Sequence, residues 1–152
     1  DSHRRAPGLS GALTGIYARE LTAESILEAL RARRCFATDG SRVFMDARAN
    51  NAFMGGEARV KTGAEVSLSL RVEGTRVIEA ATLVRDGVEV RTFPGDGTKQ
   101  LAALHVDPEL APGDHWYYWR VISEGVAPRL PGNVEVAFGK TAWSSPLFVV
   151  VE

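Results

Sequence analysis

The chain has 152 residues, with 18 lysines and arginines against 19 aspartates and glutamates, so its formal net charge is −1. This balance gives no electrostatic reason to expect nucleic acid or an acidic membrane surface as a partner. Apolar residues make up 45% and charged residues 24% of the chain, which excludes a disordered or low-complexity segment. Composition therefore predicts one folded domain, with room for an appended element.

The cysteine content limits how the fold is held together. Cys35 is the single cysteine, so an intramolecular disulfide and a four-cysteine zinc site are excluded. No run approaches the roughly 18 apolar residues of a membrane span, and the opening DSHRRAPG lacks the apolar middle of a secretory signal. Opening on Asp-Ser-His without an initiator methionine indicates a processed product or a fragment of something longer. The compartment stays open, with the cytoplasm slightly favoured.

The first forty residues predict a loop and one helix. Residues 1–20 carry turn-forming glycines and no sustained hydrophobic period, which predicts a loop. A helix is predicted over residues 22–34, because Thr22 can cap its start and apolar residues follow at helical spacing. Leu21 is expected to pack on Ile26 as a hydrophobic staple. The apolar side chains sharing one face of this helix are Ala23, Ile26, Leu27 and Leu30.

From Cys35 onward the hydrophobic period changes from 3.6 to 2, which predicts β-strands. Asp86-Gly87 is a strong hairpin signal, because glycine accepts the positive φ that a two-residue turn needs. The predicted strands lie at residues 43–49, 64–73, a hairpin over 79–93, 99–106, 115–123 and 146–151. Strands at this spacing, without intervening helices, predict a mainly-β protein: an antiparallel sandwich of about seven or eight strands, preceded by a loop and one helix.

One aromatic strand suggests which kind of sandwich this is. The stretch from Leu110 to Val121 (LAPGDHWYYWRV) resembles the late strand of immunoglobulin-like and fibronectin-like domains. If Trp119 and its alternate neighbours point inward, Trp116 and Tyr118 lie on the outer face. These two rings could stack on sugars, dock a protein partner or contact a missing domain. The ordinary alternative is edge packing under the connection at 125–139.

The three histidines form no recognisable metal-binding cluster. Asp1-Ser2-His3 is a D-x-H unit whose two side chains point the same way if the backbone is extended. Its ordinary interpretation is a fragment end or a tag remnant. His105 and His115 are predicted to be surface residues, Cys35 a small buried residue, and Ser144-Ser145 a turn before the last strand.

A longer set of motifs favours the interpretation of the D-x-H unit as part of a metal site. The sequence resembles the end of a PHP-type (polymerase and histidinol phosphatase) metal-dependent hydrolase. It is similar to the bacterial branch in which a β-sandwich follows the barrel and ends in a Trp-Ser-Ser-Pro segment. The motifs that carry this resemblance are DSHRRAPG (1–8), LTGIY (13–17), ELT (20–22), LEALRARRCFAT (27–38) and WSSP (143–146).

The resemblance implies a distorted β/α barrel that holds two or three divalent ions, such as zinc, manganese or iron. Asp1 and His3 match the D-x-H of its last strand, where a carboxylate and an imidazole together help to lower the pKa of bound water. Residues 1–38 would then be the tail of the barrel, and residues 39–152 the C-terminal sandwich. The family's opening H-x-H and its middle ligands are absent from this chain. We therefore expect the chain alone to be catalytically inactive and to bind no divalent ion tightly.

Two functions from different classes follow. The first is the C-terminal part of a PHP-type phosphoesterase or related hydrolase, whose missing N-terminal barrel is the partner of this segment. The second is a non-catalytic sandwich that binds carbohydrate or protein. A helix separated from its barrel exposes an apolar stripe, so a homodimer through residues 20–36 is also expected.

Overall fold

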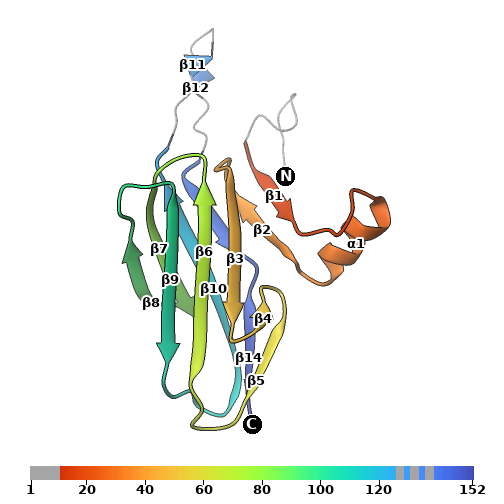
Figure 1. The fold of residues 1–152 in the computed structure, drawn as a ribbon, viewed down its shortest axis with the longest axis vertical. Helices are drawn as coiled ribbons and strands as arrows, with labels where there is room; N and C mark the ends of the chain where they lie inside the picture. The colour runs from red at the N-terminus through yellow and green to blue at the C-terminus, as the bar shows by residue number, and fades with distance from the viewer. Residues whose placement is uncertain (1–10, 126–128, 131–133, 136–138) are drawn as a thin grey trace.

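Two β-sheets packed face to face make up most of the molecule, and one short helix lies beside them (Figure 1). The structure is a computed structural model and describes residues 11–125, 129–130, 134–135 and 139–152. The helix, α1, spans Ala23–Arg31. The strands are β1 (Leu13–Ile16), β2 (Cys35–Thr38), β3 (Val43–Ala49), β4 (Ala52–Phe53), β5 (Glu57–Val60), β6 (Val66–Gly74), β7 (Ile78–Arg85), β8 (Val88–Pro94), β9 (Gln100–Asp107), β10 (Gly113–Ser123), β11 (Arg129–Leu130), β12 (Val134–Glu135), β13 (Thr141–Ser144) and β14 (Leu147–Val151).

The larger sheet has eight strands and is organised around β10. Its main order is β1-β2-β13-β10-β14-β5, and β7 pairs with the other side of β10 and carries β8. One side of β10 therefore pairs with β13 along one half of its length and with β14 along the other. The smaller sheet has the order β4-β3-β6-β9, while β11 and β12 pair with each other. These pairings are antiparallel, except that β14 runs parallel to β5.

This architecture confirms the predicted mainly-β sandwich. Seven strands in the described part of the chain have five or more residues, and they are the seven that the sequence predicts. At the turn of the predicted hairpin, Asp86 and Gly87 have φ values of 50° and 86°, as a primed two-residue turn requires. The other seven strands have four residues or fewer, which is too short for a period-2 pattern to be recognised.

The loop predicted over residues 1–20 is wrong for residues 13–16, which form β1. This strand pairs with β2, and Gly15 lies opposite Phe36. A Cβ atom on Gly15 would overlap the Phe36 ring, so the glycine lets the aromatic ring lie directly over the strand. Glycine normally weakens a strand, which is why the sequence gives no strand signal here.

The helix forms where it was predicted but is shorter. The Thr22 hydroxyl accepts a hydrogen bond from the Ser25 N–H at 3.3 Å, as a capping residue should. At the other end, Arg33 adopts a φ of 56°, and the N–H groups of Arg33 and Arg34 donate to the carbonyls of Leu30 and Ala29. These two bonds form a Schellman motif that ends the helix. The predicted staple is wrong, because Leu21 is 94% exposed.

The larger sheet continues across the predicted domain boundary at residues 38 and 39. Thr38, at the end of β2, lies opposite Ala142 of β13, and the Asp39 N–H donates to the carbonyl of Thr141. The β1–α1–β2 unit is thus an edge extension of the sandwich sheet. The assignment of residues 1–38 to the tail of a barrel stays a prediction.

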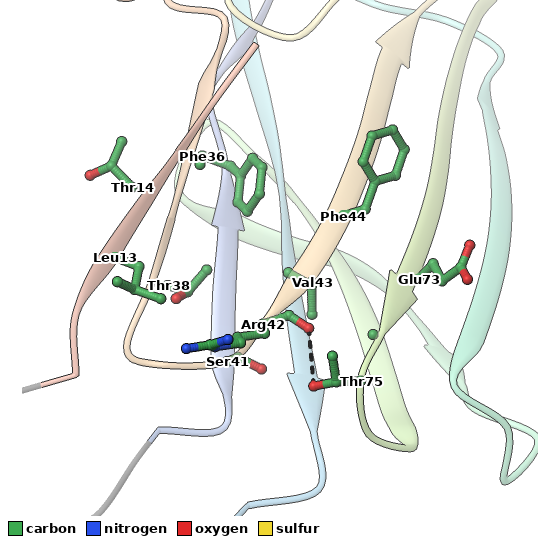
Figure 2. Close-up of a pocket in the computed structure, with 12 residues that line it drawn as sticks. Leu13, Thr14, Phe36, Thr38, Ser41, Arg42, Val43, Phe44, Glu73 and Thr75 are labelled. Carbon is green, nitrogen blue, oxygen red and sulfur yellow. Dashed lines mark hydrogen bonds between the residues drawn. The ribbon is translucent and has the colours of Figure 1, made fainter. Parts of the chain in front are cut away.

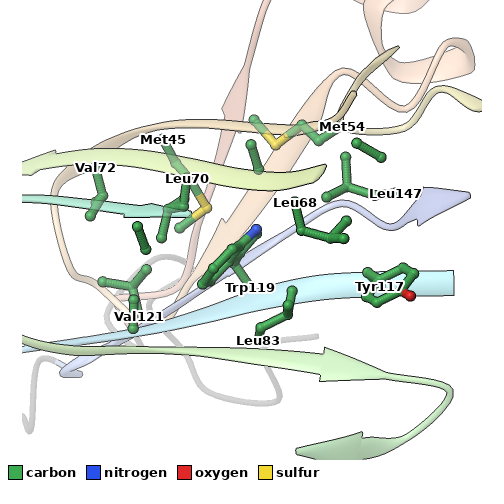
Figure 3. Packing of buried hydrophobic residues seen from close by; sticks show 14 of the residues in the cluster. Met45, Met54, Leu68, Leu70, Val72, Leu83, Tyr117, Trp119, Val121 and Leu147 are labelled. Carbon is green, nitrogen blue, oxygen red and sulfur yellow. The ribbon is translucent and has the colours of Figure 1, made fainter. Parts of the chain in front are cut away.

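The core lies between the two sheets. Tyr117 and Trp119 are fully buried and Val121 is 1% exposed, which confirms the predicted inward face of this strand. Figure 3 shows these side chains pointing from β10 toward Leu68 and Leu70 of β6. All four predicted inward positions of β6 are also at most 2% exposed. The odd positions of β10 therefore face the core, and the even positions face outward.

Tyr17 ties the β1–α1–β2 unit to the smaller sheet. Its hydroxyl donates to the carbonyl of Met45 and accepts from the Met45 N–H at 3.2 Å, so it occupies the open edge of β3. Its ring lies 5.9 Å from Phe36, 5.7 Å from Phe44 and 5.0 Å from Phe53. Burial, followed by a smaller effect of the nearby Asp46 carboxylate, raises the pKa of Tyr17, while its bond to Met45 acts in the opposite direction.

Replacing Tyr17 with phenylalanine keeps the ring contacts and removes only the hydroxyl. The Met45 backbone groups then lose a partner at a half-buried edge, so the free energy of unfolding should fall by about 1–2 kcal/mol in urea denaturation. Tyr118→Phe on the outer face is the matched control and should stay within about 0.5 kcal/mol. Equal losses in the two variants would show that the Tyr17 hydroxyl does not hold the edge of β3.

Candidate functional site

The predicted metal ligands Asp1 and His3 lie outside the described residues. Within residues 11–125, 129–130, 134–135 and 139–152, no group of three or more His, Cys, Asp or Glu side chains could hold a metal ion. The metal site stays a prediction.

The predicted outer-face aromatics Trp116 and Tyr118 lie side by side on β10. Their ring planes are parallel to within 7°, and their centroids are 6.0 Å apart. Trp116 is 39% exposed, and Tyr118 is partly exposed. Both alternate with the buried residues Tyr117 and Trp119, so their position follows from the same period-2 geometry that builds the core.

Two further aromatic residues, which the sequence analysis did not identify as site residues, join this face. Phe148 of β14 lies directly opposite Trp116, and Trp143 of β13 lies directly opposite Arg120. Residues opposite each other in an antiparallel pair lie on the same face of the sheet. The buried neighbours of each, such as Ala142 beside Trp143, confirm that both side chains point outward. We call Trp116, Tyr118, Trp143 and Phe148 the aromatic face.

Polar and charged groups border the aromatic face. Arg120 lies two residues beyond Tyr118 on the same strand and bonds Glu89 of β8 at 2.7 Å. The Arg33 guanidinium lies 5.4 Å above the centroid of the Phe148 ring, and its Nε donates to the carbonyl of Gly55 at 2.9 Å. The arrangement combines flat apolar rings with nearby hydrogen-bonding groups, which suits a ligand with both apolar and hydroxyl surfaces.

A buried polar network supports the aromatic strand from below. The Tyr117 hydroxyl donates to Asp107 Oδ2 at 2.9 Å, and Arg85 donates to the same oxygen at 2.6 Å. Asp107 belongs to the smaller sheet and is 4% exposed, so these bonds connect the two sheets. Burial, with the hydrogen bond to Asp107, raises the pKa of Tyr117, which keeps this hydroxyl a donor. The network therefore has a structural role, because it joins the two sheets.

His115 joins two turns at one end of the sandwich. Its Nδ1 contacts Asp86 Oδ2 at 2.7 Å, and its Nε2 contacts the carbonyl of Ala111 at 2.9 Å. Asp86 also accepts from the Trp116 N–H at 3.0 Å. The hydrogen bond to Asp86, then that to Ala111, raises the pKa of His115, because both favour the doubly protonated imidazolium. Partial burial raises the pKa of Asp86, but its bonds to His115 and Trp116 outweigh that effect and leave it lowered.

Other singled-out residues occupy ordinary positions. His105 is half-buried in β9 opposite Leu68. Cys35 is half-buried, with its Sγ 3.5 Å from the hydroxyl of Ser145. Ser144 ends β13 and accepts a hydrogen bond from the Trp119 N–H at 3.0 Å, so it belongs to a strand rather than to the predicted turn. None of them completes a catalytic arrangement within the described residues.

An open groove of about 560 Å³ lies where β1 and β2 diverge from β3 and β6. Figure 2 shows Phe36, Val43 and Phe44 among its apolar walls, with Arg42 and Glu73 as its charged side chains. The hydroxyl of Thr75 donates to the Arg42 carbonyl at 3.5 Å. The sequence carries no local signal for this groove, because it forms only where the two sheets separate.

The helix exposes part of its apolar stripe. Leu27 is 48% and Leu30 is 39% exposed, and Ala23, one turn before Leu27, is also exposed. Ala29 is the helix residue that is fully buried. We call Ala23, Leu27 and Leu30 the helix stripe. No helix among the described residues is long and apolar enough to cross a membrane.

Comparison with known proteins identifies relatives, all without an assigned function. A family described as "Protein of unknown function (DUF3604)" matches residues 2–68, less than half of the chain. An uncharacterized protein of Chlamydia muridarum (strain MoPn / Nigg) is 30% identical over 98% of this chain and 24% of its own length. An uncharacterized protein of Chlamydia trachomatis serovar D is 29% identical over the same shares of both chains. The chain thus spans about a quarter of the length of the curated relatives it matches.

The His115 contacts predict a pH dependence of stability. A raised pKa of His115 contributes stability that is fully present below its ordinary value of 6.5 and is lost as the pH rises through the folded-state value. The lowered pKa of Asp86 contributes stability that is present above its ordinary value of 3.8 and is lost as the pH falls through the folded-state value. We therefore expect the free energy of unfolding, measured in urea, to fall between pH 5.5 and pH 9. This fall should be larger for the unmodified chain than for His115→Gln. His105→Gln is the control and should show the same fall as the unmodified chain. An equal fall in His115→Gln would contradict a stabilising role of the protonated His115.

Proposed function

We propose that this chain is the C-terminal, non-catalytic sandwich of a longer PHP-like metal-dependent hydrolase. Asp1 and His3 are the residues through which this proposal can be tested. In this proposal the sandwich braces the catalytic domain, and Asp1 and His3 contribute a carboxylate and an imidazole to a site whose other ligands lie on that domain. The chain alone would then be inactive. The resemblance of residues 1–38 and of Trp143–Pro146 to the hydrolase motifs supports this assignment.

The helix stripe is the observation that carries the accessory role. Apolar side chains aligned along one helix face normally pack against another element, and here Leu27 and Leu30 remain substantially exposed. The C-terminal end of the helix is nevertheless tied to the sandwich, because the Arg33 Nε donates to the Gly55 carbonyl at 2.9 Å and the Tyr17 N–H donates to the Arg34 carbonyl at 2.9 Å. A rigidly presented apolar stripe on the sheet edge suits docking against a neighbouring domain.

The length of the relatives gives independent support. A chain that matches almost completely, yet covers about a quarter of each relative, has the proportions of one domain in a larger protein. The remaining length of such a relative is ample for a β/α barrel of about 250 residues. The relatives carry no functional description, so the hydrolase activity rests on the resemblance and is a proposal for this chain.

The metal proposal is tested on the longer parent protein that contains this segment. We expect the purified parent to retain divalent metal by elemental analysis, and His3→Ala to lower both metal content and phosphoesterase activity. His105→Ala, far from the proposed ligands in sequence, is the control and should change neither. A parent without bound metal, or micromolar zinc binding by the 152-residue chain that His3→Ala abolishes, would contradict the proposed division of ligands.

In the isolated chain the helix stripe should pair with a second copy. Sedimentation equilibrium should show concentration-dependent dimers, and the double variant Leu27→Lys, Leu30→Lys should be monomeric while unfolding at the same urea concentration. Leu104→Lys, at a position that is 58% exposed on the smaller sheet, is the control and should still dimerise. A strictly monomeric unmodified chain at millimolar concentration would contradict self-association through residues 20–36.

A further inference from the structure

The aromatic face brings together rings from three different strands. Tyr118 and Trp116 are neighbours along β10, Phe148 lies across from Trp116 on β14, and Trp143 lies across from Arg120 on β13. Ser145 and Pro146 form a break between β13 and β14, with Trp143 before it and Phe148 after it. Along β10, Tyr118 lies between the residues that pair with these two rings. Such a concentration of rings on an exposed sheet face is unusual, since large aromatic side chains mostly turn inward.

The strands that carry the face are well supported by the core. Val84 lies opposite Tyr118 on β7 and on the same face, and it is only 2% exposed. The strand below is fixed by the buried Tyr117 and Trp119. A surface of this kind holds its rings in place before a ligand arrives, which lowers the entropy cost of binding.

The charged groups around the rings give the face no excess of positive charge. Arg120 bonds Glu89 at 2.7 Å, and Arg33 lies against Phe148, while Asp114 lies opposite Val150 at the end of the same face. Beside Phe148 and Val150, strand β5 adds Glu57 and Arg59, and Arg59 bonds both Glu57 and Glu152. The border thus carries three guanidinium groups and four carboxylates, so its formal charge is −1. The face therefore complements an uncharged ligand better than a phosphorylated or strongly acidic one.

We propose that the aromatic face binds a neutral oligosaccharide built from pyranose units with equatorial hydroxyls, such as β-1,4-linked glucose or N-acetylglucosamine. The C–H faces of these sugars form a flat ribbon that can lie on the indole and phenol rings and bury apolar surface. Their hydroxyls reach the rim, where the Arg120 guanidinium has donors and the Glu89 carboxylate has acceptors left over from their mutual bond. The extended shape of the face, along β10 and across β13 and β14, suits several sugar units rather than one.

This binding site shares no residue with the proposed metal site or with the helix stripe. It would give the sandwich a substrate-holding role beside a catalytic domain, but it requires no part of that domain. Its test can therefore be made on the 152-residue chain, and its outcome is independent of whether the parent binds metal.

Isothermal titration of the 152-residue chain with cellohexaose and with chitohexaose tests the proposal. We expect saturable binding of at least one of them, accompanied by a change in tryptophan fluorescence, and no binding of an oligogalacturonate of the same length. Trp116→Ala should weaken the binding about tenfold or more, because it removes one stacking ring. Leu104→Ala, which shortens an exposed side chain on the other sheet, should leave it unchanged.

A second variant protects the test from unfolding artefacts. Glu89→Gln lies on the exposed strand β8 and keeps the shape of the side chain, so it should fold normally. It should still weaken binding, because it replaces one carboxylate oxygen of the rim with an NH2 donor and removes the negative charge. The proposal is overturned if neither neutral oligosaccharide binds at millimolar concentration. It is equally overturned if binding persists unchanged in both Trp116→Ala and Glu89→Gln, or if the acidic oligosaccharide binds as well as the neutral ones.

Discussion

The strict alternation of β10 is the constraint on which the rest of the structure depends. Because successive side chains of a strand point to opposite faces, burying Trp119 forces Tyr118 and Arg120 to the outside. β10 also pairs along both of its sides, with β7 on one and with β13 and β14 on the other. Its register therefore sets which residues of three neighbouring strands reach the core. One strand determines both the packing of the sandwich and the composition of its outer surface.

The sequence was sufficient to predict the parts of the fold that repeat over many residues. The long alternating strands and the Asp86-Gly87 turn depend on local geometry, which composition and spacing reveal. β1 was not predictable, because Gly15 is unfavourable in a strand and is tolerated only where the Phe36 ring covers it. Its stability comes from a pairing partner about twenty residues away, and no local pattern records such a partner.

In the aromatic face, too, some residues could be predicted from the sequence and others could not. Trp116 and Tyr118 could be placed from the alternation of their own strand. Trp143 and Phe148 could not, because β13 has four residues and Phe148 sits in the uniformly apolar run LFVVV, which carries no inside–outside pattern. Their place on the same face depends on the pairing register across the break at Pro146, and this register is a property of the folded sheet.

Arg33 connects the end of the helix with the aromatic face. Its positive φ is unfavourable for a residue with a side chain, and a glycine would adopt it without strain. The arginine side chain offsets this cost by bonding the Gly55 carbonyl and by lying over Phe148 at the border of the aromatic face. The residue that ends the helix thus also anchors that end to the outer face of the sandwich. A domain docked on the helix stripe would accordingly be held in a defined position relative to the aromatic face. The two proposals, a docked domain and a bound ligand, would then be coupled through this one residue.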